Sequence, residues 1–304
     1  MQKYFYSEQT QKKMRGKFRG HDKLYGKAMP RFPVSAEREY IRLVNAYFRG
    51  IKAVLEEELP TLKEEYQKKY EDYKAVHMDG LFDFDAFVNS FFSKIQKRLD
   101  DMDIFGKWIK DLRKIGMITK KSEIAEWKRM VKKTLNVDLS EDYYSGDFFD
   151  DLMEQWISDN VDLIKTVPND MLGRMKQIVS DGYQNGTRPK DMAEKIQDAY
   201  GMSRSHAQFI ARDQISKLNA KITQREHADA GVTEYVWSSS GDERVRESHR
   251  RLNGHIFKYS DPPETDNGRR CNPGEDYNCR CVAIPVFKED TMSLALRDDE
   301  EITT

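Results

Sequence analysis

Residues 242–254, DERVRESHRRLNG, and residues 271–281, CNPGEDYNCRC, hold the side chains that decide the fold of the C-terminal third. Together they give the spacing H-x21-C-x7-C-x-C, with turn-forming segments in between. Imidazole and thiolate donors together favour Zn²⁺, which takes four ligands in structural sites, and such a site would stabilise a small loop-rich unit. The sequence predicts zinc as the candidate cofactor, held by His249, Cys271, Cys279 and Cys281.

The same residues allow two other interpretations, which the sequence leaves open. The cysteines could be small buried side chains, with His249 making an ordinary hydrogen bond. Two of them could also form a disulfide after release from the cell. The odd number of cysteines, three, argues against a disulfide framework in a chain made in a cytoplasm.

A catalytic interpretation can also be drawn from these stretches. Asp242 or Glu243, with His249 and a metal, could hydrolyse a phosphodiester while Arg246 stabilises the developing charge. The chain has no P-loop and no HExxH motif, however. A structural use explains the same residues, because Asp242 could cap a short helix and Arg246 could pair with an internal carboxylate. We therefore expect no catalytic residue and no enzyme activity.

Helix signals precede these stretches, and strand signals surround them. Pro189 opens a helix that Gly201 would end, and Ser203 would cap a longer helix that ends at Gly231. Together with a short sheet, these helices predict a small α+β domain at residues 186–288. The strand candidates are residues 233–237, 256–259 and 282–287.

The region before this domain has the apolar spacing of helices. Ser35 would cap a first helix that runs to Pro60, and no further proline occurs before Pro168. We predict a helical domain at residues 34–185 and hence an α+β protein, largely α-helical over its N-terminal two-thirds. The further amphipathic segments are residues 61–76, 83–101, 105–116, 121–136 and 147–165.

The two ends of the chain carry opposite charge. Residues 1–33 hold nine Lys and Arg against two acids, a net charge of +7, and residues 288–304 have a net charge of −4. We interpret residues 1–33 as a basic N-terminal arm and residues 289–304 as an acidic tail, although two solvated, disordered ends would have the same composition. The arm residues expected to contact DNA or a partner protein are Lys12, Lys13, Arg15, Lys17 and Arg19.

Membrane and secretion signals are missing from the sequence. It has no run of about 18 or more apolar residues, and no apolar segment follows the charges of the first residues. We therefore expect synthesis in a cytoplasm and no membrane contact.

The C-terminal motifs follow one another in a specific order. A helix with I-A-R-x6-N comes first, then a strand that ends in tryptophan, then D-x-R-V-R-x-x-H-x-x-L-x-G, proline-rich turns and N-C-R-C. In this order they resemble the Mu F-like domain of phage head morphogenesis proteins, over about residues 168–288. The pair Asp213-Gln214 departs from the Thr-Glu of the family pattern. The residues that carry the resemblance are Ile210, Ala211, Arg212, Asn219, Trp237, Asp242, Arg244, Val245, Arg246, His249, Leu252, Gly254, Pro262, Pro263, Pro273, Gly274, Asn278, Cys279, Arg280, Cys281 and Pro285.

The resemblance implies a minor head (minor capsid) protein, present in few copies and associated with the portal. Its partners would be the portal protein and a capsid or scaffolding protein, with double-stranded DNA as a further, non-specific partner of the basic arm. It would assist head morphogenesis and DNA packaging or ejection. It would lie in the virion, in the head interior or at the portal vertex, after assembly in the host cytoplasm. The structural motif of the domain would comprise Trp237, Asp242, Arg244, Arg246 and Asn278.

Two rival functions remain open on the sequence. A metal-dependent nuclease or toxin-like effector predicts DNA cleavage that is lost on Asp242→Ala or His249→Ala. A host DNA-binding protein predicts salt-sensitive DNA binding that is lost with residues 1–33. The head-protein interpretation instead predicts co-purification with a portal ring.

Overall fold

The computed structural model describes residues 12–13, 15–76, 82–102, 104–139 and 147–294. The described residues group into two compact units, each assembled from segments that are separate in the sequence. Unit 1 draws on Met1–Arg38, Arg113–Trp156 and Arg212–Thr304, and unit 2 draws on Glu39–Leu112 and Ile157–Ala211. The domain boundaries placed after residues 33, 185 and 288 stay predictions.

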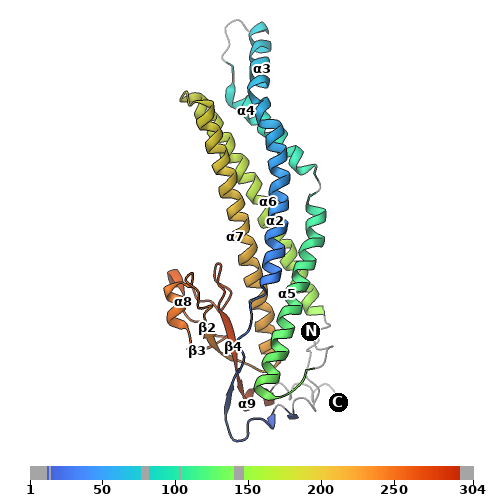
Figure 1. The fold of residues 1–304 in the computed structure, drawn as a ribbon, viewed down its shortest axis with the longest axis vertical. Helices are drawn as coiled ribbons and strands as arrows, with labels where there is room; N and C mark the ends of the chain where they lie inside the picture. Colours follow the sequence, from blue (N-terminus) through green and yellow to red (C-terminus); the bar gives the residue numbers. More distant parts are fainter. Residues whose placement is uncertain (1–11, 14, 77–81, 103, 140–146, 295–304) are drawn as a thin grey trace. The chain divides into compact units, whose positions relative to one another are not determined.

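The described residues confirm the α+β fold class, with long helices first and a small sheet toward the C-terminal end (Figure 1). None of the described helices is long and apolar enough to cross a membrane. The helices are α2 (Val34–Glu58), η1 (Leu59–Thr61), α3 (Leu62–Val76), α4 (Phe84–Asp100), α5 (Ile104–Leu135), α6 (Asp147–Gln184), α7 (Pro189–Asp229), α8 (Glu247–Leu252), η3 (Asp266–Gly268) and α9 (Glu289–Leu294). The strands are β1 (Lys23–Tyr25), β2 (Glu234–Ser238), β3 (Ile256–Lys258) and β4 (Val282–Lys288).

Several predicted helices are continuous where the sequence indicated a break. The prediction that Gly201 ends a helix is wrong, because α7 runs through it. One glycine inside a helix costs about 1 kcal/mol relative to alanine. Ala199 and Ala207 are buried on either side of Gly201, so packing of the neighbouring turns offsets that cost. Likewise, α5 joins two predicted segments, and α6 continues through Pro168.

The described part of unit 2 is built from helices, and large apolar side chains fill its interior. Trp108 of α5 is buried with its ring edge-on to Tyr47 of α2, at a centroid distance of 5.3 Å. One buried polar contact accompanies this packing, since the hydroxyl of Tyr40 donates to Asn160 Oδ1 at 2.7 Å. The buried carboxylate of Glu58 accepts hydrogen bonds from Lys94 and Arg98 of α4, whose side chains are exposed.

Unit 1 contains a four-stranded antiparallel sheet in the order β1-β4-β2-β3. Figure 1 shows β2, β3 and β4 gathered with α8. The sequence predicted β2, β3 and β4 but missed β1, which pairs with β4 in the register Lys23 with Lys288. A three-residue strand at the sheet edge has too little alternation to be recognised from sequence.

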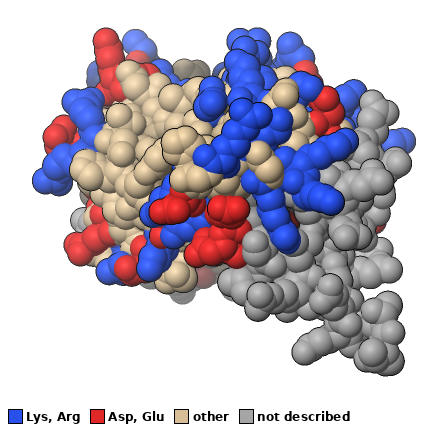
Figure 2. Space-filling view, turned by 90° about the horizontal axis from the view of Figure 1, so that it is seen from below, with Lys and Arg blue, Asp and Glu red and all other residues tan. Residues whose placement is uncertain are grey.

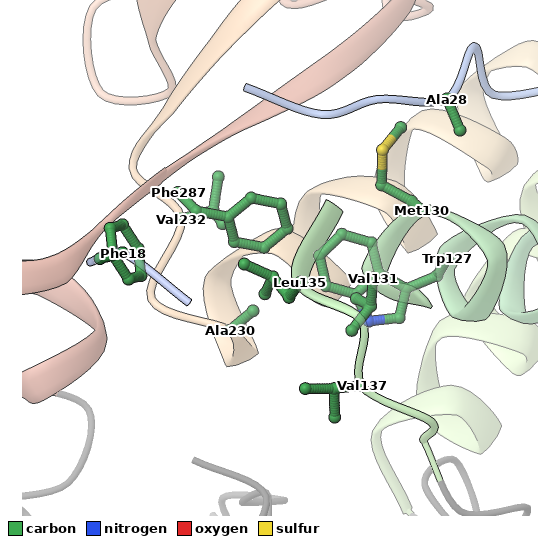
Figure 3. Packing of buried hydrophobic residues seen from close by; sticks show 10 residues of the cluster. All are labelled: Phe18, Ala28, Trp127, Met130, Val131, Leu135, Val137, Ala230, Val232 and Phe287. Carbon is green, nitrogen blue, oxygen red and sulfur yellow. The ribbon is translucent and has the colours of Figure 1, made fainter. Parts of the chain in front are cut away.

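The main core of unit 1 joins the sheet to α5 and to the end of α7. Figure 3 shows Trp127 and Leu135 of α5 beside Phe287 of β4 and Val232. The rings of Trp127 and Phe287 stack at a centroid distance of 5.9 Å. This apolar packing holds the helix ends and the strand together.

Part of the basic arm belongs to this unit. Phe18 is fully buried in the same core, and the amide of Gly26 donates to the carbonyl of Pro285 at 2.9 Å. Of the predicted binding residues, Lys12, Lys13 and Arg19 are exposed, whereas Arg15 and Lys17 are half-buried. Residues 1–11 of the arm and 295–304 of the acidic tail lie outside the described residues.

Candidate metal centre

His249 lies at the centre of the candidate site, on the buried face of the short helix α8. Its ring is 2% exposed and meets the edge of the Trp237 ring of β2 at a centroid distance of 5.3 Å. The expectation that Asp242 caps this helix is wrong, because α8 begins at Glu247. Asp242 Oδ1 instead accepts from the amide of Arg244 at 2.9 Å, within the preceding turn.

Two of the three cysteines face His249. The distance from His249 Nδ1 is 3.4 Å to Cys279 Sγ and 3.5 Å to Cys281 Sγ. In a tetrahedral zinc site with Zn–S of about 2.3 Å and Zn–N of about 2.0 Å, the nitrogen–sulfur edge is about 3.5 Å long. The spacing of these donor atoms therefore fits a zinc ion bound by one imidazole and two thiolates.

Cys271 is separate from this cluster. Its half-buried sulfur accepts from the hydroxyl of Thr265 at 3.8 Å, and it is not among the ligand atoms that lie within 4.8 Å of one another around His249. After Cys271 the chain turns back toward His249, which it contacts first at Asp276 and then at Cys279 and Cys281. Of the predicted ligands, the described structure brings His249, Cys279 and Cys281 together.

Asp276 holds the other side of the histidine ring. Its Oδ2 lies 3.2 Å from His249 Nε2, and its carboxylate also meets Arg246 at 3.3 Å and Arg269 at 2.6 Å. The side chain of Asp276 is fully buried. A carboxylate that accepts from the second nitrogen of a ligating histidine fixes the ring orientation and strengthens the nitrogen donor. Asp276 therefore aims Nδ1 at the sulfur atoms.

Arg246 takes the role that the sequence predicted for it. Its Nε lies 2.9 Å from Asp266 Oδ2, and its terminal nitrogen donates to the carbonyl of Tyr277 at 3.0 Å. Together with its contact to Asp276, the guanidinium of Arg246 connects the start of α8 to Asp266 and to the segment Asp276–Tyr277, which precedes Cys279. The prediction of an internal carboxylate partner for Arg246 is confirmed.

The electrostatics of the cluster favour a thiolate at one sulfur. The hydrogen bond from Cys281 holds the pKa of Cys279 well below its usual range, and the same bond raises the pKa of Cys281. Burial lowers the pKa of His249, but the hydrogen bond and charge of Cys279 outweigh it, so the net shift is upward. Burial would likewise raise the pKa of Asp276, yet the Tyr277 amide and Arg246 lower it overall. The second thiol would lose its proton on binding a metal.

The loop that carries the cysteines is fixed to α7 through polar and steric contacts. The amide of Asn278, whose φ is 49°, donates to Asp213 Oδ1 at 2.8 Å. Asp213 therefore has a polar role, although it departs from the family pattern. Gly274 has a φ of 85°, and a Cβ there would lie 2.9 Å from the Cβ of Ala220. Only glycine allows this approach without a shift.

Sequence reasoning missed the carboxylates of this site. Asp276 and Asp266 lie in turn-rich segments, where acidic residues usually face solvent. The available signal was the position of Asp276 inside CNPGEDYNCRC, between the first cysteine and the two that approach His249. Conversely, Arg244 of the predicted motif has an exposed side chain.

The comparison with known families agrees with this geometry. Residues 174–284 match the family described as Phage Mu protein F like protein. This part of the chain is a Mu F-like domain. The match contains His249, both cysteines that face it and Asp276, so the family prediction drawn from the ordered motifs is confirmed.

Two relatives are similar to parts of the chain. An uncharacterized protein of Haemophilus influenzae is 40% identical over 164 residues, which is 54% of this chain and 36% of that relative. An uncharacterized protein of Methanocaldococcus jannaschii is 30% identical over 110 residues, 36% of this chain and 16% of that relative. The chain therefore spans well under half of either relative. No solved structure matches the chain.

Proposed function

We propose that the protein is a minor head protein of a tailed phage, which joins the head at the portal vertex and assists morphogenesis. The observation that carries this proposal is the Mu F-like match over residues 174–284. The other support is that this stretch is held by a buried network around Asp276, as expected of a rigid assembly module. DNA packaging or ejection would be the stage at which it meets DNA.

The basic arm supplies the partner-binding surface in this proposal. Lys12, Lys13 and Arg19 are exposed and lie directly before strand β1. Figure 2 shows Lys and Arg side chains gathered on one face, with a smaller acidic group beside them. Lysine and arginine bind phosphate oxygens or an acidic protein surface without reading sequence.

The portal interaction can be tested by coexpression with the portal protein of the same phage. We expect co-purification, and we expect Lys12→Glu with Lys13→Glu to weaken it at least several-fold. Deleting residues 1–33 is unsuitable because it would remove β1 and the buried Phe18. Lys68→Glu with Lys69→Glu, exposed on α3, is the matched control. Failure of the parent protein to associate with portal or capsid would reject the proposal.

We also propose that a zinc ion, bound by His249, Cys279 and Cys281, stabilises the Mu F-like domain. The 3.4 and 3.5 Å donor spacings and the carboxylate behind the ring support it. Elemental analysis should find about one zinc per chain. We expect Cys279→Ser and Cys281→Ser to lose the metal and Cys271→Ser to keep it. No zinc in the parent protein would reject the site, and loss in Cys271→Ser would restore the four-ligand prediction.

A metal-dependent nuclease is the alternative function, and one observation favours it. The ligand atoms of His249, Asp266 and Asp276 lie within 4.8 Å of one another, with Arg246 beside them. Against it, His249 and Asp276 are buried, so a DNA phosphate reaches them only if the loop opens. Incubation of plasmid DNA with the protein and Mg²⁺, Mn²⁺ or Zn²⁺ decides the matter. Cleavage that disappears in Asp276→Asn would replace the structural proposal with this one.

A further inference from the structure

A second group of polar side chains lies inside unit 1, where α5 and α7 face each other. Glu123 of α5 and Glu226 of α7 are 3% and 0% exposed. Glu123 Oε1 accepts from the hydroxyl of Thr223 at 2.5 Å. Glu123 Oε2 and both carboxylate oxygens of Glu226 have no hydrogen-bond partner in the described part of the chain. Three buried carboxylate oxygens are thus left unsatisfied.

Further oxygen atoms lie on the same face of α7. Ser216, Asn219, Thr223 and Glu226 follow one another at spacings of three and four residues, which places them along one side of a helix. Asn219 Oδ1 and Ser216 Oγ are also buried without a partner among the described residues. Ser216, Asn219 and Thr223 also border a cavity of about 10 Å³, which is lined on another side by Cys279 and Cys281 and not by either glutamate.

Arginines that follow Glu123 on α5 and precede Glu226 on α7 are paired with other carboxylates. On α5, Arg129 pairs with Glu126. On α7, Arg225 Nε lies 2.8 Å from Asp229 Oδ1. The two buried glutamates therefore receive no compensating charge from these arginines.

His227, which is also buried on α7, adds no positive charge. Nδ1 of His227 on α7 lies 2.6 Å from the hydroxyl oxygen of Tyr259, and burial lowers the pKa of His227 to about 3, which keeps it neutral. Burial raises the pKa of Glu123 to about 7, and burial with the charge of Glu123 raises that of Glu226 further. A buried carboxylate pair of this kind requires protons or a bound cation.

We propose that Glu123, Glu226, Asn219 and Thr223 bind one hard divalent cation, Ca²⁺ or Mg²⁺, between α5 and α7. All the donor atoms are oxygens, the ligand type that these two ions prefer, and both charges of the ion are matched by the two carboxylates. The site differs in its donor atoms from the His249 cluster, whose sulfur and nitrogen donors suit zinc. Unlike the proposed zinc ion, this ion would connect the helices α5 and α7 within unit 1.

The test uses the full-length protein, with zinc kept saturating and other metals removed by chelation and dialysis. Thermal unfolding is then followed with added Ca²⁺ or Mg²⁺. At a hundredfold excess over Kd, we expect Tm to rise by roughly 5–10 °C. Glu226→Gln and Glu123→Gln should abolish this rise. Glu37→Gln, which removes a buried partner of Arg280 in the same unit, should lower Tm but keep the response.

A protonated acid pair is the outcome that would overturn the site. In that case Ca²⁺ and Mg²⁺ leave Tm unchanged, and Glu226→Gln is as stable as the parent at pH 7 or more so. If the glutamine variants fail to fold, equilibrium dialysis of the parent protein against Ca²⁺ and Mg²⁺ settles the question. One bound ion per chain beyond zinc supports the site, and none refutes it.

Discussion

The Mu F-like loops of unit 1 and the helices of unit 2 are stabilised in different ways. In unit 1, one fully buried carboxylate, Asp276, connects His249, Arg246 and Arg269, and two cysteines complete the cluster. In unit 2, Trp108 and its neighbours contribute by apolar burial spread over several helices. A polar network needs particular residue types at fixed positions, whereas apolar packing accepts many combinations. This explains why the first region carries a recognisable sequence signature and the second does not.

The largest expected effect is at the centre of the polar network. Asp276→Ala leaves Arg246, Arg269 and His249 without their shared buried acceptor, and we expect the free energy of unfolding to fall by about 3–5 kcal/mol. Urea unfolding followed by circular dichroism measures this change. Arg244→Ala, at an exposed position of the same motif, should change stability by less than about 0.5 kcal/mol. A loss below about 1 kcal/mol for Asp276→Ala would show that the network does not hold the loops.

The corresponding change in unit 2 should cost less for one residue. Leu112 of α5 is fully buried, and Leu112→Ala should lower the free energy of unfolding by about 2–4 kcal/mol, through lost burial and the cavity left behind. Ile109→Ala on the same helix is the control, because Ile109 is 43% exposed. Equal losses in the two variants would contradict the assignment of Leu112 to the core.

The smallest expected effect concerns the charge cluster around Glu58 in unit 2. Hydrogen bonds from Lys94 and Arg98 hold the pKa of Glu58 below its usual 4.5. A lowered carboxyl pKa stabilises the fold above pH 4.5, and this stabilisation is lost as the pH falls through the lower, folded-state value. Glu58→Gln should therefore cost about 1 kcal/mol at pH 7 and almost nothing near pH 2.

Thermal unfolding of the parent and of Glu58→Gln between pH 7 and pH 2 measures this difference. Glu64→Gln, at an exposed position of α3, serves as the matched control and should show no such trend. A gap between parent and Glu58→Gln that stays constant over the whole pH range would contradict the ionic contribution.

The parts of the fold that could be predicted from sequence are those with local signals. Apolar spacing located the helices, alternation located β2, and the turn-rich segments between the strand candidates delimited β3 and β4. The errors at Gly201 and β1 share a physical cause, because both depend on contacts with distant residues. A helix continues through glycine when its neighbours are buried, and a three-residue strand forms when β4 offers it an edge.

The sequence predicted the ligand types of the candidate site, but not which of the four predicted ligands lie together. His249, Cys279 and Cys281 lie together because the turns after Cys271 return the chain to α8. Only the structure shows that Cys271 lies outside this cluster. Asp276 was missed because the sequence does not show whether the side chain of an aspartate in a turn is buried or exposed. The buried pair of Glu123 and Glu226 was missed for a similar reason, as charged residues at helical spacing usually face solvent.

Strand β1 can pair with β4 only after β4 has been synthesised. Lys23 leaves the ribosome about 265 residues before its partner Lys288. At roughly 5–20 residues per second, this delay is on the order of ten to fifty seconds. During that interval Phe18 has no strand β4 to cover it, so the nascent chain displays an uncovered apolar and basic segment. In a ribosome-bound intermediate, this segment would be the natural target for a chaperone, and its protection would mark the moment at which the sheet closes.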